Sequence, residues 1–574
     1  MWSLKIWLMG ALVTAPGVAS AAEVAVSDSA GLLAAIAAAE AGDTITLAAG
    51  TYVIQQPKIA CNSEGTAQAP IVVRAASPGE VLLKMDTLEG FHVRGAFWRF
   101  EGLDVEGTCA DDSACEHAFH VTGAAHGVQI RGSRMHGFNA MIKGNGEPIG
   151  PGNSYVWPND VEILYNEFFN AAPRNTSNPV TFIDVVGGQR WVLRGNFIHD
   201  HAKGGGNNIS YAAFLKGHSK DGLIERNLVV CELLHSGQVR LGLSLGGGGT
   251  SPDSICEDGA CKPEHERGTI RNNLIVNCPA DVGIYVNAGA DSVIAHNTIY
   301  NSAGIDMRFP ETSGVVQNNL LSGKIRDRDG ASSTKLGNLS ELSLADFAAW
   351  FVAPADFDFE LKDGAALVDQ AAPLVSVKDD YCGNLRDDGA PDIGAIEYDG
   401  EGCAGGIPAA EATTTGDPST SGDPSTSGDP STGAESSTSA ESSTSSGSSS
   451  GSSSGSTGGD PSTSGSDETA GATGSASAGG SASETASGGQ EADEDGCACS
   501  SASGAGWGAG GLLVLASLGL RRRRVAVYTS SPVMAATPAA PSASADVPAA
   551  RRRASSRRSR SASASSGWAP SSRS

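Results

Sequence analysis

A short internal repeat runs through this chain of 574 residues and limits the possible folds more than any other feature. Each copy has a short apolar run, an Asn and a second apolar run, as in VEILYNEFF at 161–169 and WVLRGNFIH at 191–199. The repeated positions are Asn166, Asn196, Asn227, Asn273, Asn297 and Asn319, with weaker copies at Leu103 and Ser133. Successive copies lie 22 to 33 residues apart, except for one step of 46. This period, with short β-branched runs, indicates a solenoid.

Two other repeat architectures do not fit the pattern. Helical repeats are excluded because no segment of 90–330 keeps apolar residues at helical spacing for three turns. A propeller needs about four strands for every ~40–45 residues and a blade signature, which is missing. The sequence therefore predicts an all-β fold, a right-handed parallel β-helix over about 43–330. The Asn residues would stack as a buried amide ladder at one turn of every coil.

The ends of such a stack need covers, because open strand edges promote aggregation. Residues 29–40 read as a short helix with Ser27 or Asp28 as N-cap, and they precede the first coil. The segment DFAAWF at 346–351 predicts a second covering helix, and the turn-rich end at 383–398 is expected to pack back on the last coils. The long repeat step predicts an insertion at about 246–267.

Four further segments flank the predicted β-helix domain, 22–403. Residues 1–21 have the Lys, apolar run and small-residue pattern of a signal peptide. Residues 404–496 are rich in Ser, Thr, Gly, Pro and acids and cannot form a core, so we expect a disordered linker. Residues 497–524 contain a Cys pair, an apolar stretch at the short limit for a transmembrane segment, and an Arg run. Residues 525–574 read as a disordered basic tail.

The order of features in 497–524 resembles the myxobacterial C-terminal sorting signal, MYXO-CTERM. This resemblance implies a secreted protein that is held at the cell surface by the outer membrane. The partner expected at this end of the chain is therefore a membrane.

Composition indicates which partners the protein can bind and whether its cysteines are oxidised. The formal charge of −25 argues against a nucleic-acid binder, because little would be gained from counterion release. The pairs Cys109/Cys115 and Cys256/Cys261 lie in short loops and read as local disulfides, which suits secretion. The domain holds an odd number of cysteines, so one thiol is left over or pairs elsewhere. We expect a monomer.

A basic island at 190–240 is the candidate site, with seven Lys and Arg against four Asp and Glu. Lys216 and Arg240 lie 24 residues apart, about one coil, and should be neighbours on one face. Beyond the insertion, the following coils would offer Tyr285 or Asn287 and then Arg308, with His218 nearby. This column predicts a groove for an extended sugar chain. Asp306 and Arg328, one coil apart, predict a salt bridge.

The domain resembles the alginate lyase and chondroitinase B type of polysaccharide lyase. The resemblance rests on GDTITLAAGTY at 42–52, GTAQAPIVVRAASPGEVLL at 65–83 and FWRFEGLDVEG at 97–107. Within FLKGHSKDGLIERN and SGQVRLG, it implies Lys216 and Arg240 as catalytic residues.

In β-elimination, Lys216 would remove the proton next to a uronate carboxylate, and Arg240 would neutralise that carboxylate. A bound Ca²⁺ could share the second role through oxygen ligands. Two functions stay open: a uronate lyase, or a surface β-helix that binds glycan without cleaving it.

Overall fold

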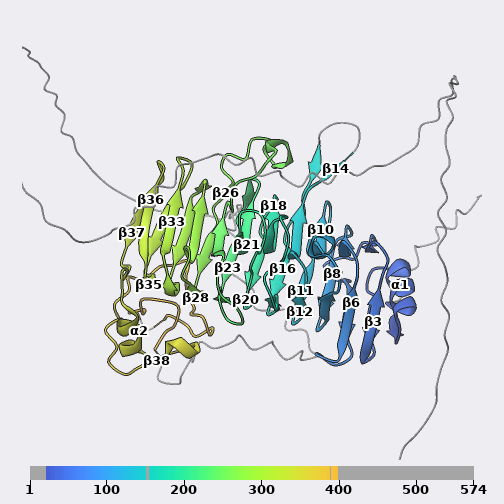
Figure 1. The fold of residues 1–574 in the computed structure, drawn as a ribbon, viewed down its shortest axis with the longest axis horizontal. Coiled ribbons are helices and arrows are strands. Elements are labelled where there is room, and N and C mark those ends of the chain that lie inside the picture. Colours follow the sequence, from blue (N-terminus) through green and yellow to red (C-terminus); the bar gives the residue numbers. More distant parts are fainter. Residues whose placement is uncertain (1–20, 150–153, 388, 399–574) are drawn as a thin grey trace, which may run out of the picture. The chain divides into compact units, whose positions relative to one another are not determined.

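The computed structural model describes residues 21–149, 154–387 and 389–398, and it confirms the predicted parallel β-helix. Successive coils stack from α1 (Ser29–Ala38) at one end to β36 (Lys324–Arg328) and β37 (Ser332–Leu336) at the other (Figure 1). A typical coil gives one short strand to each of three parallel sheets, which we name A, B and C in chain order. The short strands match the short apolar runs of the repeat.

Sheets A and B hold the strands on either side of the repeated Asn. The strands of sheet A are β1 (Glu23–Val26), β2 (Thr44–Leu47), β5 (Ile71–Ala75), β8 (Trp98–Glu101), β11 (Gln129–Arg131), β16 (Glu162–Leu164), β19 (Val192–Arg194), β23 (Leu223–Glu225), β27 (Thr269–Arg271), β31 (Ser292–Ala295), β34 (Ser313–Gln317) and β37. The strands of sheet B are β3 (Gly50–Ile54), β6 (Val81–Met85), β9 (Asp104–Gly107), β12 (Arg134–His136), β17 (Glu167–Phe169), β20 (Phe197–His199), β24 (Leu228–Val230), β28 (Leu274–Cys278), β32 (Thr298–Ser302) and β35 (Leu320–Leu321).

Sheet C has the longest strands and carries the candidate functional residues on its outer face. Its strands are β4 (Ile59–Cys61), β7 (Glu89–Val93), β10 (His117–Thr122), β13 (Ala140–Asn145), β18 (Val180–Val186), β21 (Ile209–Lys216), β25 (Val239–Leu245), β29 (Ile284–Asn287), β33 (Gly304–Arg308) and β36. Short additional strands are β14 (Glu147–Pro148), β15 (Tyr155–Val156), β22 (Ser219–Lys220), β26 (His265–Glu266), β30 (Gly289–Ala290), β38 (Phe351–Ala353) and β39 (Asp358–Leu361).

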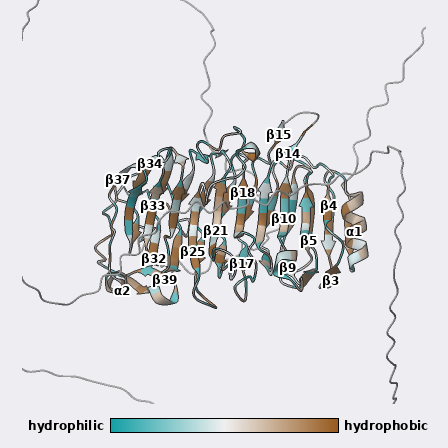
Figure 2. Cartoon of the chain, turned by 45° about the horizontal axis from the view of Figure 1, so that its top comes forward, coloured by the Kyte–Doolittle hydropathy of each residue, from teal (hydrophilic) through white to brown (hydrophobic). Residues whose placement is uncertain are grey.

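The core fills the inside of the coils with side chains stacked in register. In sheet C, Phe91, Phe119 and Ile142 pair in consecutive strands, and all three are fully buried. Because side chains alternate along a strand, the residues next to these three on each strand point outward. The alternation of hydrophobic and hydrophilic residues is visible along the strands in Figure 2. Side chains at inward positions therefore form the core and stabilise the fold, and side chains at outward positions are available for function.

The repeated Asn side chains form one continuous ladder at the turn between sheets A and B. The Nδ2 of Asn166 donates to Oδ1 of Asn196 at 3.1 Å, and Asn196 donates to Asn227 at 2.9 Å. The same contact joins the members in order, Asn227, Asn273, Asn297 and Asn319. The ladder extends to Asn338, which the repeat pattern missed, because Asn319 donates to its Oδ1 at 2.9 Å.

The two predicted covering helices have different outcomes. Helix α1 begins after Asp28, whose carboxylate accepts from the N–H of Gly31 at 2.7 Å, and its Leu32 is fully buried in the core at the first coil. Helix α2 (Leu344–Trp350) forms, but it does not cover the last coil. Its Phe347 packs on Tyr300 of β32, on the outer side of sheet B. In Figure 1, α2 lies below β35.

The predicted end cover is therefore wrong in position. The last strands, β36 and β37, keep most of their residues exposed or half-buried. They carry charged side chains, which discourage pairing with another sheet edge. The turn-rich end packs back on the coils as predicted, since the N–H of Ala395 donates to Thr298 at 2.9 Å.

Disulfides tie down two loops and one pair of strands. Both predicted pairs form, Cys109 with Cys115 and Cys256 with Cys261. A third disulfide joins Cys231 to Cys278 across neighbouring coils. Within the described residues, the buried Cys61 is a free thiol. The second loop lies in the insertion between β25 and β27, as the repeat step predicted.

The predicted linker, sorting signal and basic tail lie outside the described residues, and so does almost all of the signal peptide. The described residues contain no helix that is long and apolar enough to cross a membrane.

Candidate functional site

The outer face of sheet C places Lys216 and several predicted site residues in one column. Lys216 ends β21, and the strand register sets Gly246 beside it in the next coil. Gly246 is followed by Asn287, Arg308 and Arg328 in the next three coils. We call these five residues the Lys216 column. Neighbouring members lie about 4.8 Å apart, so the column runs along the axis of the β-helix.

Arg240 does not belong to this column, which corrects the predicted pairing with Lys216. Arg240 pairs with Ser210 at the opposite end of β21, roughly 20 Å from Lys216 along the strand. One coil is 30 residues long at this point, so the spacing of 24 misplaced it. The side chain of Arg240 is 1% exposed and donates to the carbonyl oxygens of Cys231 and Gly237.

Gly246 explains why no side chain stands beside Lys216 in the next coil. Its φ is +95°, and an added Cβ would meet the carbonyl oxygen of Asn287 at 1.8 Å. An arginine at this position would require a shift of the backbone. Register and sterics together therefore leave Lys216 without the neighbour that the lyase resemblance implies.

Arg240 instead belongs to a buried cluster around Asp200, which we call the Asp200 cluster. The Asp200 carboxylate accepts from the backbone N–H groups of Leu233, Leu234 and His235, at 2.9–3.2 Å. It also contacts His199 Nδ1 at 2.8 Å, and the Arg240 guanidinium lies 3.6 Å away. Burial opposes ionisation, but these contacts outweigh it and lower the pKa of Asp200. The cluster fixes the loop before β25.

Lys216 and His218 both contact the insertion. The Lys216 ammonium donates to the carbonyl of Gly249 at 2.7 Å and lies 4.6 Å from the centre of the Phe214 ring. His218 Nδ1 is 2.9 Å from the carbonyl oxygen of Pro263 and 3.5 Å from Asp258. Lys216 is half-buried and His218 is buried, so the insertion shapes this end of the column.

Tyr285 and Arg308 are brought together on neighbouring coils. Arg308 donates to the Tyr285 hydroxyl at 3.4 Å and pairs with the exposed Asp329. Burial, the largest influence, raises the pKa of Tyr285, so the phenol stays protonated. The predicted salt bridge between Asp306 and Arg328 forms at 2.7 Å. The third and fourth coils of the predicted groove therefore have the expected residues.

A cavity of about 280 Å³ lies between the insertion and these coils. Asn287 belongs both to its wall and to the Lys216 column, and Glu264 faces it from the insertion. Glu264 accepts from Thr250 and from the N–H of Gly217. Burial is the largest influence on this carboxyl and raises its pKa. The cavity extends the polar surface beside the column.

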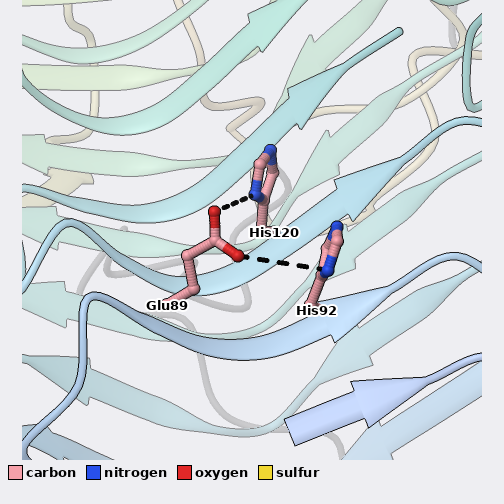
Figure 3. Close-up of side chains that lie close together, drawn as sticks. All are labelled: Glu89, His92 and His120. Atoms are coloured by element: carbon pink, nitrogen blue, oxygen red, sulfur yellow. Dashed lines mark hydrogen bonds and ion pairs between the residues drawn. The ribbon is translucent and has the colours of Figure 1, made fainter. Parts of the chain in front are cut away.

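A second cluster on the outer face, which the sequence analysis missed, contains Glu89, His92 and His120 (Figure 3). His92 and His120 pair in register on β7 and β10, with their rings stacked 5.1 Å apart. Glu89 Oε1 lies 3.0 Å from His120 Nδ1, and Oε2 lies 4.0 Å from His92 Nδ1. The hydrogen bond from His120 is the largest cause that lowers the pKa of Glu89 to about 2. We call this the Glu89 cluster.

A sequence signal for this cluster exists. The triplet Phe-His-Val occurs at 91–93 and again at 119–121, one coil later. In each copy an inward Phe is followed by an outward His. These early coils show only weak copies of the Asn repeat, so the repeat does not mark them.

Comparisons with known proteins agree with the fold. The chondroitinase B family model matches residues 26–141, which include the whole Glu89 cluster and end before Lys216 and Arg240. No curated protein matches the sequence.

Among solved structures, the pectate lyase Pel9A is 16% identical, with a TM-score of 0.44, over 66% of this chain and 97% of that one. A rhamnogalacturonan lyase is 16% identical, with a TM-score of 0.42, over 55% and 84%. An alginate lyase from Paenibacillus sp. str. FPU-7 is 15% identical, with a TM-score of 0.36, over 49% and 97%. The family-model match and the described coils together make this chain a parallel β-helix that resembles polysaccharide lyases.

Proposed function

We propose that this protein binds an extended, uronate-containing polysaccharide along the outer face of sheet C. The observation that carries the proposal is the Lys216 column, which sets the cations of Lys216, Arg308 and Arg328 along the helix axis. The coil spacing of about 4.8 Å is close to the length of one sugar unit in an extended chain. In a polymer that lies along the column, each successive sugar can thus contact the next coil.

The chemistry of the column suits an acidic sugar rather than a neutral one. Arg308 is partly exposed and offers N–H groups that can hold a carboxylate in two places. Asn287 adds an amide, and Tyr285 beside it adds a hydroxyl. Because the chain as a whole carries a charge of −25, an anionic polymer needs such a local cationic track to be held.

Cleavage by β-elimination is the further step that the lyase resemblance suggests. A base removes the proton next to the uronate carboxylate, a carbon–carbon double bond forms, and the bond to the leaving oxygen breaks. Lys216 is our candidate for the base. Arg240 is too buried to neutralise the carboxylate, and no neighbour from the next coil replaces it. This observation favours the alternative function, glycan binding without cleavage.

The remaining expectations stay proposals. Ca²⁺ could neutralise the substrate carboxylate, with Glu264 in the cavity wall as a source of oxygen ligands. Attachment at the cell surface rests on the sorting signal, and deletion of 497–574 should release the protein into the medium. The monomeric state is also a proposal.

The test uses the full-length protein with alginate, pectate and chondroitin. Binding is measured by calorimetry, and cleavage by the ultraviolet absorbance of the unsaturated product. Lys216→Ala and Arg308→Ala should each weaken binding about 3- to 10-fold, and Lys84→Ala should not. Lys84 is a matched control because it is similarly exposed and ion-paired, but lies on sheet B. Equal binding by all four proteins, or no binding to any polymer, contradicts the proposal.

A further inference from the structure

We propose that the Glu89 cluster is a binding site for a divalent transition metal such as Zn²⁺, with Glu89, His92 and His120 as ligands. One ligand atom from each residue lies within 4.8 Å of the other two. The site is independent of the proposed polysaccharide, because it lies several coils away from the Lys216 column. The positions of the protons on the two imidazole rings decide whether the cluster can take an ion.

The hydrogen bonds of His120 fix a proton on Nε2. Its Nε2 lies 2.6 Å from the side-chain oxygen of Asn145. The orientation of Asn145 is fixed because its Nδ2 donates to the carbonyl of Gly146 at 2.9 Å. The imidazole must therefore donate from Nε2, which leaves Nδ1 facing Glu89. The Nδ1 donates to the Glu89 carboxylate, and a metal ion that displaces this proton would bind the lone pair that the nitrogen then offers.

The hydrogen bonds of His92 have the same consequence. Its Nε2 lies 3.2 Å from the Thr122 hydroxyl oxygen and 3.5 Å from Glu147. The Thr122 hydroxyl donates its own proton to Glu147 at 2.6 Å, so its oxygen accepts from His92. Two neighbouring rings thus present Nδ1 to one carboxylate, and each ring is oriented through Nε2 by an outer acceptor. Metal-binding histidines in proteins are usually held in this way.

Electrostatics requires a proton or a metal ion at the point where these groups meet. Two lone pairs and a carboxylate repel one another unless protons or a metal ion lie between them. Lys58, the nearest ammonium to Glu89, lies 3.7 Å from Oε2 and is half exposed. The three ligand atoms need only move together slightly, to the separation of about 3.3 Å that ligand atoms have in a tetrahedral zinc site.

The type of ligand selects the metal. Two imidazole nitrogens and one carboxylate suit Zn²⁺ and its neighbours in the first transition row, whereas Ca²⁺ and Mg²⁺ prefer oxygen. The side chains of both histidines are 10% exposed and that of Glu89 is 19% exposed. A bound ion would therefore be reached from the outer face of sheet C, where water or a ligand oxygen could take a fourth position.

Calorimetric titration of the full-length, untagged protein with ZnCl₂ at neutral pH tests this proposal. Cys497 and Cys499 are replaced by Ser throughout, so that these thiols do not bind the ion. We expect one Zn²⁺ per chain, with release of protons if the rings are charged beforehand. Substitution with Co²⁺ should give visible absorption bands that report the coordination number, and Ca²⁺ should not compete.

The variants separate the proposed ligands from the outer acceptor and from an unrelated histidine. Glu89→Gln, His92→Gln and His120→Gln should each abolish binding or weaken it more than about 100-fold. Asn145→Ala should weaken it about 10- to 100-fold, because the ring of His120 loses its orientation. The matched control is His136→Gln, since His136 lies 3.3 Å from Asp104 without a second histidine, and it should bind like the parent.

Circular dichroism shows whether each variant keeps the fold. No zinc binding by the folded parent, or equal binding by the folded ligand variants, overturns the proposal. Either result would mean that the cluster is an imidazolium–carboxylate pair held by protons alone.

Discussion

The Glu89 cluster and the Asp200 cluster contain the same kinds of groups, a carboxylate with histidines, but they satisfy the carboxylate differently. Asp200 is completely buried, and three backbone N–H groups, a histidine and an arginine surround it. The Glu89 carboxylate is partly exposed and faces two histidine rings and one lysine.

The difference separates a structural role from a functional one. The backbone N–H groups around Asp200 hold a loop in place. If the Asp200 carboxylate turned away to bind a ligand, these N–H groups would be left unpaired. Side chains around Glu89 are already oriented by outer acceptors, so their inner atoms are available to an ion. The contacts of a buried charge therefore say more about its role than its residue type does.

The largest effect expected from this comparison comes from a matched pair of isosteric variants. Asp200→Asn removes the charge that faces Arg240 and several N–H groups, and should cost about 3–5 kcal/mol of unfolding free energy. Glu89→Gln should cost about 1.5 kcal/mol, because the site is partly hydrated. Denaturant unfolding of both variants measures the difference. Equal losses of unfolding free energy would show that the two clusters have the same structural role.

The second effect compares two asparagines. Asn227 is fully buried in the ladder, where it donates to Leu193 and Asn273 and accepts from Asn196. Asn227→Ala should cost about 2–3 kcal/mol, since it leaves buried partners unpaired. Asn145→Ala, at the Glu89 cluster, should cost less than about 1 kcal/mol and act on metal affinity instead. The comparison fails if the second variant unfolds as easily as the first.

The third effect is the response to acid. The pKa values of Asp200 and Glu89 are both lowered in the folded protein, that of Glu89 to about 2. Their stabilisation is therefore complete above the ordinary carboxyl pKa and is lost as the pH falls through the folded value. Melting temperature should fall from about pH 5 to about pH 2, with a shallower slope in each amide variant than in the parent. An unchanged slope would mean that neither carboxylate titrates with unfolding.

The smallest effect concerns the lysine beside Glu89. Lys58→Ala removes a half-exposed ion pair and should change the unfolding free energy by less than about 0.5 kcal/mol. Zinc affinity should rise slightly, about 2- to 3-fold, because a competing cation has left the carboxylate. Calorimetry on the variant measures both changes, the first from its thermal unfolding and the second from its titration with zinc. A fall in affinity would place Lys58 among the groups that support the site.

Much of the fold could be predicted from the sequence because the Asn ladder needs one residue at one turn of every coil. The ladder gives no information about the length of the segment on the far side of that turn. Arg240 shows the consequence: its distance along the chain from Lys216 looked like one coil, yet the register sets it opposite Ser210. Asn287 and Arg308 were predicted in the right column because the coils after the insertion have regular lengths.

The candidate site was only partly predictable for the same reason. His92 and His120 become neighbours through strand register, and Glu89 reaches them from an irregular start of β7. Nothing in their linear spacing marks them as one group until the coil boundaries are known. The cover of the last coil was wrong because apolar residues on the outer side of sheet B accept α2, which composition alone does not reveal.

The most direct test of the central claim, that the outer face of sheet C is the functional surface, is a crystal structure with a uronate oligosaccharide. We predict electron density for sugars along the Lys216 column, with a carboxylate within hydrogen-bonding distance of Arg308 or Lys216. Sugars bound instead on the outer side of sheet A or sheet B, with sheet C bare, would contradict the account.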